Sequence, residues 1–194
     1  MKHKEISLQT KKTLAASLKK YMEKKALSKI TVSEIIADCG VNRKTFYYHF
    51  EDIYALLKWM LEQEAIEVVK QFDLLVNPKE ALTFVMNYVE ANKHILNCAY
   101  DSMGHDGLKR FFYQDFIELV RSIIDRAEEK LDISIDEAFK TYLSDFLTEA
   151  LAGNLISYFR SKDTGNREEL LQNILLICKA SIPNILLAKV NNSK

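Results

Sequence analysis

Helix-breaking residues are rare in this chain, whose 194 residues include only five glycines and two prolines. The stretches between them repeat apolar residues at the three- and four-residue spacing of a helix face. None alternates apolar and polar residues between hairpin turns, as a half-buried strand would. Hydrophobic residues make up 48% of the chain and charged residues 28%, a balance typical of soluble globular proteins. We therefore predict an all-α fold.

The boundaries of the expected helices follow from the apolar spacing and from the residues that begin and end each pattern. Asn77 followed by Pro78 is the strongest start signal of the second half, because proline is favoured at the first helical position. The predicted helices span 8–25, 32–39, 43–49, 52–75, 78–97, 108–130, 136–161 and 167–189, with a short one near 99–104.

Two short helices joined by a tight turn are expected within 31–49. Thr31 and Glu34 have the spacing of a capping box that opens the first helix. Gly40 follows where a left-handed cap favours glycine, and Asn42 is a good N-cap for the second helix. Helix, glycine-containing turn and helix at this spacing predict a helix-turn-helix.

The aromatic run that ends this motif divides between a core face and an outer face. Val41, Phe46 and Phe50 repeat at roughly helical spacing and are expected to pack inward. A helix with cations and phenols on its outer side suits a DNA major groove, where its first residues reach base edges. Tyrosine hydroxyls and cations also bind phosphates. The side chains left on this outer face or its edges are Arg43, Lys44, Thr45, Tyr47, Tyr48 and His49.

The net charge of zero conceals an asymmetry between the two ends of the chain. Residues 1–60 hold twelve Lys and Arg against six Asp and Glu, whereas residues 61–194 hold fifteen against twenty-one. A basic head on an acidic body indicates that the head meets a polyanion. The alternative is that a lysine-rich first helix is merely solvated.

At these residues the chain resembles the DNA-binding domain of the TetR family of bacterial transcription regulators. The resemblance covers roughly residues 8–60 and is carried by the stretch ITVSEIIADCGVNRKTFYYHFEDIYALL. The capping box, the turn glycine, the aromatic block and the Leu56-Leu57 pair occur in it together at the family's spacings.

The resemblance implies a DNA-binding domain at 1–52 and a helical ligand-sensing and dimerisation domain at 53–194. It also implies a cytoplasmic homodimer that binds a double-stranded DNA operator, usually as a repressor. In the family, DNA contacts come from the start of the helix-turn-helix, the start of the recognition helix and its tyrosines. The predicted DNA-binding set is therefore Thr31, Ser33, Asn42, Arg43, Lys44, Thr45, Tyr47, Tyr48 and His49.

One position departs from the family pattern. Family members often carry a phosphate-binding lysine three residues after the last phenylalanine, where this chain has Ile53, preceded by Glu51 and Asp52. The two acids suit a helix N-terminus but repel phosphate. Lysines at positions 2, 4, 11 and 12 could compensate.

The C-terminal half resembles a subgroup of the family. Residues 147–177 are similar to the last two helices of a subgroup that includes regulators of dihydroxyacetone kinase operons. Some members of that subgroup activate transcription together with a protein partner. An activator or adaptor controlled by a protein partner is therefore the alternative to a repressor.

The broad apolar faces of the last two helices predict a four-helix interface across a two-fold axis, with packing inside one subunit as the alternative. The predicted interface is Leu143, Phe146, Leu147, Ala150, Leu151, Leu155, Leu171, Ile174, Leu175 and Cys178. Aromatic residues crowd the middle of the chain and predict a small-molecule pocket, with simple core packing as the alternative. The predicted pocket residues are Phe84, Tyr88, His94, Tyr100, Phe112, Phe116 and Tyr142.

Other chemistry is not indicated. His94 and Cys98 have a spacing that could hold a metal, with His105 nearby, but a third ligand is not evident. The three cysteines lie far apart, as expected in a reducing cytoplasm. No apolar run reaches the roughly 18 residues of a membrane span, and no catalytic motif is present. We predict a non-enzymatic regulator without metal or cofactor, released from DNA by a small-molecule effector.

Overall fold

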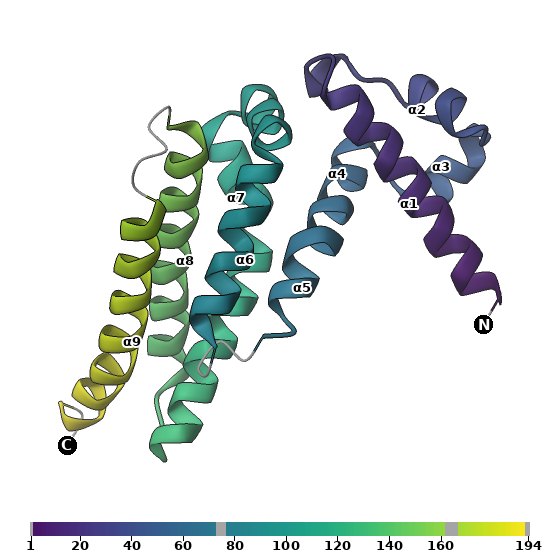
Figure 1. Ribbon diagram of the computed structural model, residues 1–194. Coiled ribbons are helices and arrows are strands. Elements are labelled where there is room, and N and C mark those ends of the chain that lie inside the picture. Colours follow the sequence, from purple (N-terminus) through teal and green to yellow (C-terminus); the bar gives the residue numbers. More distant parts are fainter. Residues whose placement is uncertain (1, 73–76, 162–166, 193–194) are drawn as a thin grey trace. The chain divides into compact units, whose positions relative to one another are not determined.

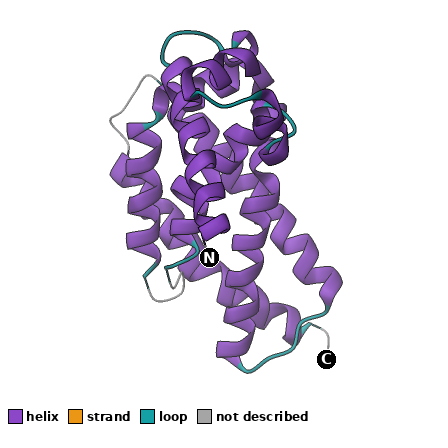
Figure 2. Cartoon of the chain, turned by 90° about the vertical axis from the view of Figure 1, so that its right-hand side faces the viewer, coloured by secondary structure: helices purple, strands orange, loops and turns teal. Residues whose placement is uncertain are grey.

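The computed structural model describes residues 2–72, 77–161 and 167–192, and Figure 1 shows the path of the chain. Only helices and loops occur within these described residues (Figure 2), which confirms the all-α prediction. The N-terminal elements are α1 (Lys2–Met22), the 3-10 turn η1 (Leu27–Lys29), α2 (Val32–Cys39), α3 (Arg43–His49), α4 (Ile53–Leu61), η2 (Glu62–Ile66) and α5 (Glu67–Val69). The long C-terminal helices are α6 (Pro78–Ala91), α7 (Lys93–Leu131), α8 (Glu137–Arg160) and α9 (Arg167–Asn191).

Several predicted boundaries differ from the structure. The helix expected over 8–25 spans Lys2–Met22, and the helix expected over 78–97 ends at Ala91, before α7 begins at Lys93. The helix expected over 52–75 is divided, because α4 passes into the π-helical turn η2 and the short α5; residues 73–76 lie outside the described part. The break expected at 104–107 is present but is limited to Gly104, whose non-helical φ of 72° and ψ of 177° kink α7 and separate two helical segments. The loop expected at 162–166 also lies outside the described residues.

The first compact unit comprises Met1–Glu67 together with Asn92–Leu108, the N-terminal part of α7. Its core is built from the fully buried side chains of Leu14, Ile35 and Phe46, which come from α1, α2 and α3. The returning segment is attached by a hydrogen bond from the Ser28 amide to the Ser102 hydroxyl, at 3.3 Å. The predicted boundary between a DNA-binding domain at 1–52 and a sensing and dimerisation domain at 53–194 divides the chain by function, and it stays a prediction.

The second compact unit comprises Val68–Ala91 and Lys109–Lys194, and its long helices run side by side in Figure 1. One core cluster joins α7, α8 and α9 through Ile124, Leu143 and Leu186. At one end of the bundle, Glu90 of α6 accepts hydrogen bonds from Tyr158 at 2.6 Å and Arg167 at 2.9 Å. These contacts join α6 to both C-terminal helices and fix the walls of the cavity described below.

Candidate nucleic-acid interface and apolar cavity

The helix-turn-helix begins with a complete capping box. The Thr31 hydroxyl accepts from the Glu34 amide at 3.3 Å, and the Glu34 carboxylate accepts from the Thr31 amide at 2.9 Å. The Lys25 ammonium bonds the same carboxylate at 2.6 Å. The hydrogen bond from Lys25, followed by those from Thr31, lowers the pKa of Glu34 to about 2. Glu34 therefore holds the start of α2 to the end of α1 as a carboxylate.

The turn between α2 and α3 depends on one glycine and one asparagine. Gly40 has φ 65° and ψ 26°, the left-handed conformation in which a Cβ is unfavourable. Asn42 then caps α3 by accepting from the Thr45 amide at 2.8 Å and the Thr45 hydroxyl at 3.1 Å. Together they set the direction in which α3 leaves the turn.

Two phenylalanines anchor α3 to the first unit. Phe46 is fully buried and Phe50 is 5% exposed. Their rings lie 6.1 Å apart, and Phe50 packs on Trp59 of α4 at 5.8 Å. Because these side chains occupy the inner face, the opposite face of α3 is directed to solvent.

The outer face of α3 presents two cations and two phenols. Arg43, Lys44 and Tyr47 are exposed, and Tyr48 is exposed to 79%. The Arg43 guanidinium lies 5.6 Å from the centre of the Tyr47 ring and donates to its hydroxyl at 3.4 Å. This contact limits the freedom of the guanidinium before any partner binds.

The other predicted DNA-binding residues lie around this face. Thr31, Ser33 and Asn42 are exposed, whereas Thr45 and His49 are half-buried. The His49 ring packs edge-on against Tyr48 at 4.9 Å. Burial, followed by the positive charge of Lys11, lowers the pKa of His49.

A hollow of about 370 Å³ lies beside Tyr48, between α1, α3 and α4. It is lined by Lys4, Ser7, Leu8, Lys11, Tyr48 and Trp59. At the start of α4, where the family resemblance leads one to expect a lysine, Ile53 is buried and Asp52 caps the helix by accepting from the Ala55 amide at 2.8 Å. Cations that could meet a phosphate here therefore come from α1.

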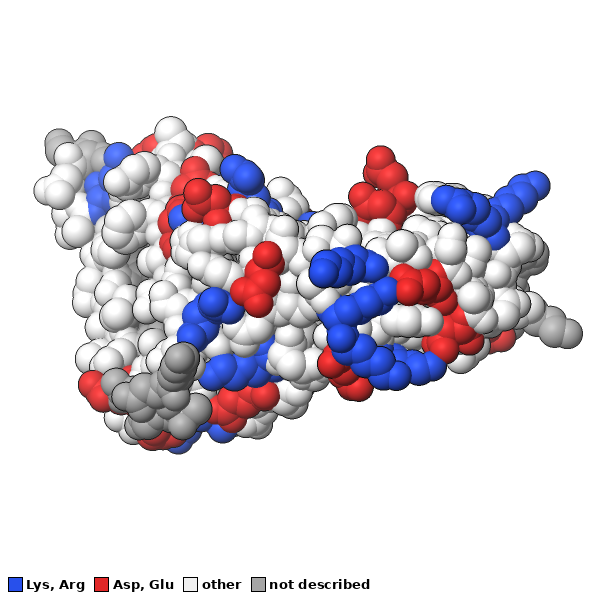
Figure 3. All heavy atoms as spheres, turned by 90° about the horizontal axis from the view of Figure 1, so that it is seen from above, with Lys and Arg blue, Asp and Glu red and all other residues white. Residues whose placement is uncertain are grey.

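Charges of both signs alternate on the face of the molecule drawn in Figure 3. Several basic side chains of the first unit are paired on its surface, Lys20 with Asp38 and Lys25 with Glu34. Arg43 and Lys44, on the outer face of α3, form no ion pair within the described residues, and Arg43 contacts Tyr47. Unpaired positive charge therefore lies on the outer face of α3.

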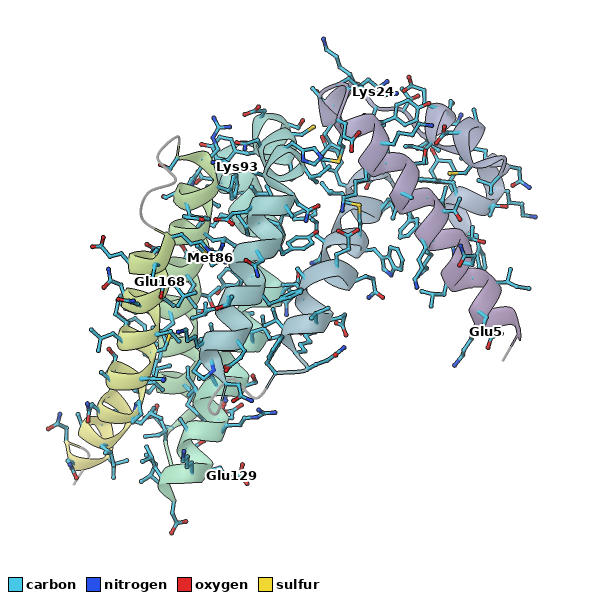
Figure 4. All side chains as sticks on the ribbon, in the orientation of Figure 1. Glu5, Lys24, Met86, Lys93, Glu129 and Glu168 are labelled. Atoms are coloured by element: carbon cyan, nitrogen blue, oxygen red, sulfur yellow. The ribbon has the colours of Figure 1, made fainter. Side chains whose placement is uncertain are left out.

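A cavity of about 460 Å³ lies within the second unit, between α6, α7, α8 and α9. Its wall on α6 includes Met86, which is labelled in Figure 4. The cavity is lined by Val69, Pro78, Ala81, Leu82, Val85, Met86, Phe116, Leu119, Val120, Ile123, Ala127, Lys130, Leu131, Leu151, Leu155, Leu170, Ile174, Cys178, Lys179, Ile182 and Pro183. Except for the two lysines and the cysteine, these side chains are hydrocarbon or thioether.

Of the seven predicted pocket residues, the structure places only Phe116 at this cavity. Phe112 stacks on Phe116 at 5.7 Å, Phe84 packs on Phe72 at 6.2 Å, and Tyr142 is 64% exposed. Tyr88 is half-buried away from the cavity, and His94 and Tyr100 belong to the first unit.

The lining of the cavity differs from the predicted pocket set, which still stands as a prediction. Most of the described side chains that line the cavity are aliphatic, and Phe116 is the one aromatic side chain among them. The apolar spacing of Leu82, Val85 and Met86 on α6 was the signal that could have identified the lining.

The predicted interface residues also divide between different surroundings. Leu143 and Leu171 are buried in their own chain, Leu147 packs on the core cluster, and Leu175 is half-buried. Phe146 and Ala150 are exposed. Four of the predicted residues, Leu151, Leu155, Ile174 and Cys178, line the cavity.

Large apolar side chains of α8 and α9 are left uncovered by the chain itself. They are Tyr142 and Phe146 of α8, which stack at 6.5 Å, and Leu176 and Ile177 of α9. By length and composition α9 could cross a membrane, with a mean hydropathy of 1.6 over an 18-residue window, of which 17% is buried. Exposed apolar patches mark contact sites for other proteins or for membranes.

Metal chemistry finds no support in the described ranges, which contain no group of three or more His, Cys, Asp and Glu side chains that could hold an ion. His94, Cys98 and His105 do not form such a group.

Comparison with known proteins matches both halves of the chain. Residues 16–60 match the family described as "Bacterial regulatory proteins, tetR family", and residues 76–179 match the "Transcriptional regulator C-terminal region". The HTH-type dhaKLM operon transcriptional activator DhaS of Lactococcus lactis subsp. lactis (strain IL1403) is 23% identical over 185 residues, covering 95% of this chain and 92% of that protein. A solved structure titled "Dihydroxyacetone kinase operon activator DhaS" has the same fold, with a TM-score of 0.67, 21% identity, and coverage of 89% of this chain and 96% of that one.

Proposed function

Because the chain belongs to the TetR family of bacterial transcription regulators, we propose that its α3 helix enters the major groove of an operator and reads base edges. The observation that carries this proposal is the division of α3 between a buried Phe46 and an outer face of Arg43, Lys44, Tyr47 and Tyr48. Arginine bonds guanine bidentately in the major groove. The phenols and the lysine suit the flanking phosphates.

We propose that two copies bind together through the uncovered apolar side chains of α8 and α9. These are Tyr142, Phe146, Leu176 and Ile177, and each is more than half exposed in the single chain. Two-fold symmetry would bring the same patch of both copies together in a four-helix contact. Such a dimer would present two α3 helices to half-sites about 34–36 Å apart.

The cavity of the second unit is the proposed effector site. Its size lies within the range of about 300–1,000 Å³ typical of small-molecule sites. An effector acts if it prefers one of two conformations that differ in DNA affinity. A hundredfold change in affinity corresponds to about 2.7 kcal/mol of coupling. Because α7 supplies residues to both units, we propose it as one route for this coupling.

The sign of regulation has two candidates. The family resemblance predicts a repressor that leaves DNA when the effector binds. Activation is the second candidate, and it is favoured by the curated relative and the solved structure, which are both named DhaS and both named activators. In an activator, the uncovered apolar side chains of α8 and α9 could bind a protein partner.

The test of DNA binding is selection from a random duplex library with the purified protein, followed by sequencing. A palindrome with half-sites about one helical turn apart is the expected result. The Arg43→Ala, Lys44→Ala double variant serves as the control and should enrich no palindrome. Failure of the native protein to enrich any site would contradict independent operator binding and favour the partner-dependent activator. Transcription from a promoter carrying the selected site then gives the sign.

A further inference from the structure

We infer that the cavity takes an amphiphile with an unbranched hydrocarbon chain and a carboxylate head, that is, a free fatty acid of medium length. The inference rests on the proposed function, because it assigns a ligand class to the proposed effector site. Two observations carry it: the chemistry of the cavity wall and the position of its two cations.

The wall offers almost no hydrogen-bonding group to a ligand. Among the described residues, the side chains around the cavity include no hydroxyl, amide, imidazole or carboxylate, and Cys178 contributes only a weakly polar thiol. A sugar, polyol or nucleotide would leave several of its polar groups unpaired in this space, which is unfavourable. A flexible alkyl chain has no hydrogen bond to lose there, and its removal from water is favourable. The wall therefore selects for hydrocarbon.

In the ranges that the structure describes, the two lysines supply the only charge at the wall. Lys130 lies in the last turn of α7 and Lys179 lies on α9, and both are exposed although they line the cavity. Exposed residues that also line a cavity mark its opening. Long lysine stems can extend the apolar wall while the ammonium groups stay in water.

These lysines differ from most cations of the same unit. Lys140 bonds Glu128 at 2.9 Å, and Lys189 bonds Asp136 at 3.2 Å. Within the described part of the chain, neither Lys130 nor Lys179 forms an ion pair. Two unpaired ammonium groups at the opening of a hydrocarbon cavity match a ligand with an anionic head and an apolar tail. A carboxylate is the simplest such head.

The test measures binding of octanoate, decanoate and dodecanoate to the full-length protein by isothermal titration calorimetry, below their critical micelle concentrations. Each added methylene should tighten binding about fourfold, since burial of one CH₂ contributes about 0.8 kcal/mol. Dodecanol, which has the same chain and a neutral head, should bind at least tenfold more weakly than dodecanoate. Equal binding of the two would overturn the assigned carboxylate.

Variants separate the cavity from non-specific association of an amphiphile. The Lys130→Met, Lys179→Met double variant keeps the apolar stems and should bring dodecanoate down to the affinity of dodecanol. Arg110→Met is the matched control, because Arg110 is exposed on α7 and does not line the cavity. The affinity of this variant for dodecanoate should be unchanged. Val85→Trp places a ring in the cavity and should abolish binding of every chain length. Retained dodecanoate binding in a folded Val85→Trp variant would overturn the assigned site.

Failure of the inference and failure of the proposed function give different results. If the protein binds its selected DNA site but no fatty acid, the ligand class is wrong and the DNA-binding function stands. If dodecanoate binds with the expected head-group dependence but no duplex is enriched, the ligand class stands and independent operator binding fails. Fluorescence anisotropy of the labelled site with and without dodecanoate then shows whether the ligand changes DNA affinity.

Discussion

Each side chain of α3 has one of two roles, and the i to i+4 spacing separates them. Phe46 and Phe50 lie four residues apart and anchor the helix, whereas Arg43 and Tyr47, also four apart, meet on the outer face. Such a cation–π contact at an exposed site contributes about 0.5–1 kcal/mol. It lowers the entropic cost of presenting the guanidinium to a base.

Replacement of Arg43 by alanine tests base reading at this position. If Arg43 bonds a guanine, Arg43→Ala should cost about 1–3 kcal/mol on the selected site. The loss should be much smaller on a duplex changed at that base pair, and fluorescence anisotropy on both duplexes measures it. An equal loss on every duplex would show that Arg43 contacts only phosphate.

Replacement of Lys4 tests whether α1 supplies the phosphate contact that Ile53 cannot make. Lys4 lines the hollow beside Tyr48, whereas the nearby Lys12 is exposed on α1 outside it. Lys4→Met should weaken binding to all duplexes alike and reduce the slope of log K against log salt by about 1. Lys12→Met is the control. If both variants behave alike, the hollow has no special part in DNA binding.

At the scale of elements, caps and breakers decide where each helix begins and ends. The capping box at Thr31, the turn at Gly40 and the N-cap at Asn42 were all predicted, because each depends on residues adjacent in the chain. A break near Gly104 was predicted too, and Gly104 has a non-helical backbone that kinks α7 there. The π-helical turn after α4 was not predicted, because the residues of η2 carry no local signal for it.

Gly40→Ala tests the turn. The left-handed backbone costs an L-residue about 1–2 kcal/mol, and the added Cβ would meet nothing within 4 Å. We therefore expect a loss on the order of 1 kcal/mol in the free energy of unfolding, measured by urea denaturation, from conformational strain alone. Gly40→Asn is the control, since asparagine tolerates this conformation. If Gly40→Ala leaves the free energy of unfolding unchanged, the turn is not held in the left-handed region.

Glu34→Gln tests the electrostatic part of the capping box. The pKa of Glu34 is lowered in the folded chain from 4.5 to about 2. The stabilisation from the charged carboxylate is therefore complete above about pH 4.5 and is lost as the pH falls toward 2. The native protein should unfold at a higher urea concentration than Glu34→Gln at pH 7, and the difference should shrink between pH 4.5 and 2. If the difference in unfolding between the native protein and Glu34→Gln does not depend on pH, it comes from the hydrogen-bond geometry of the capping box and not from the charge of Glu34.

At the scale of the whole molecule, the sequence shows which helices are apolar but not which side of each is covered. Ten apolar residues of α8 and α9 were assigned to one interface, and the structure distributes them between the core, the cavity and the surface. Both helices carry apolar residues around much of their circumference, so periodicity does not give their rotation in the bundle. Only the packing of α6 and α7 against them shows it.

Phe146→Asp tests the dimer at the uncovered apolar side chains of α8 and α9. Phe146 is 60% exposed in the single chain, so an aspartate there should leave the fold of one subunit intact. In a two-fold contact, the substitution would place one carboxylate on each copy of the apolar patch. The two charges would lose their hydration without gaining a partner. Analytical ultracentrifugation should therefore show monomers, with DNA affinity reduced because one half-site is lost. Ile6→Asp, at a site 57% exposed in the first unit, is the control and should remain dimeric. A dimer that persists in Phe146→Asp would place the contact on another face and leave the apolar patch for a different protein partner.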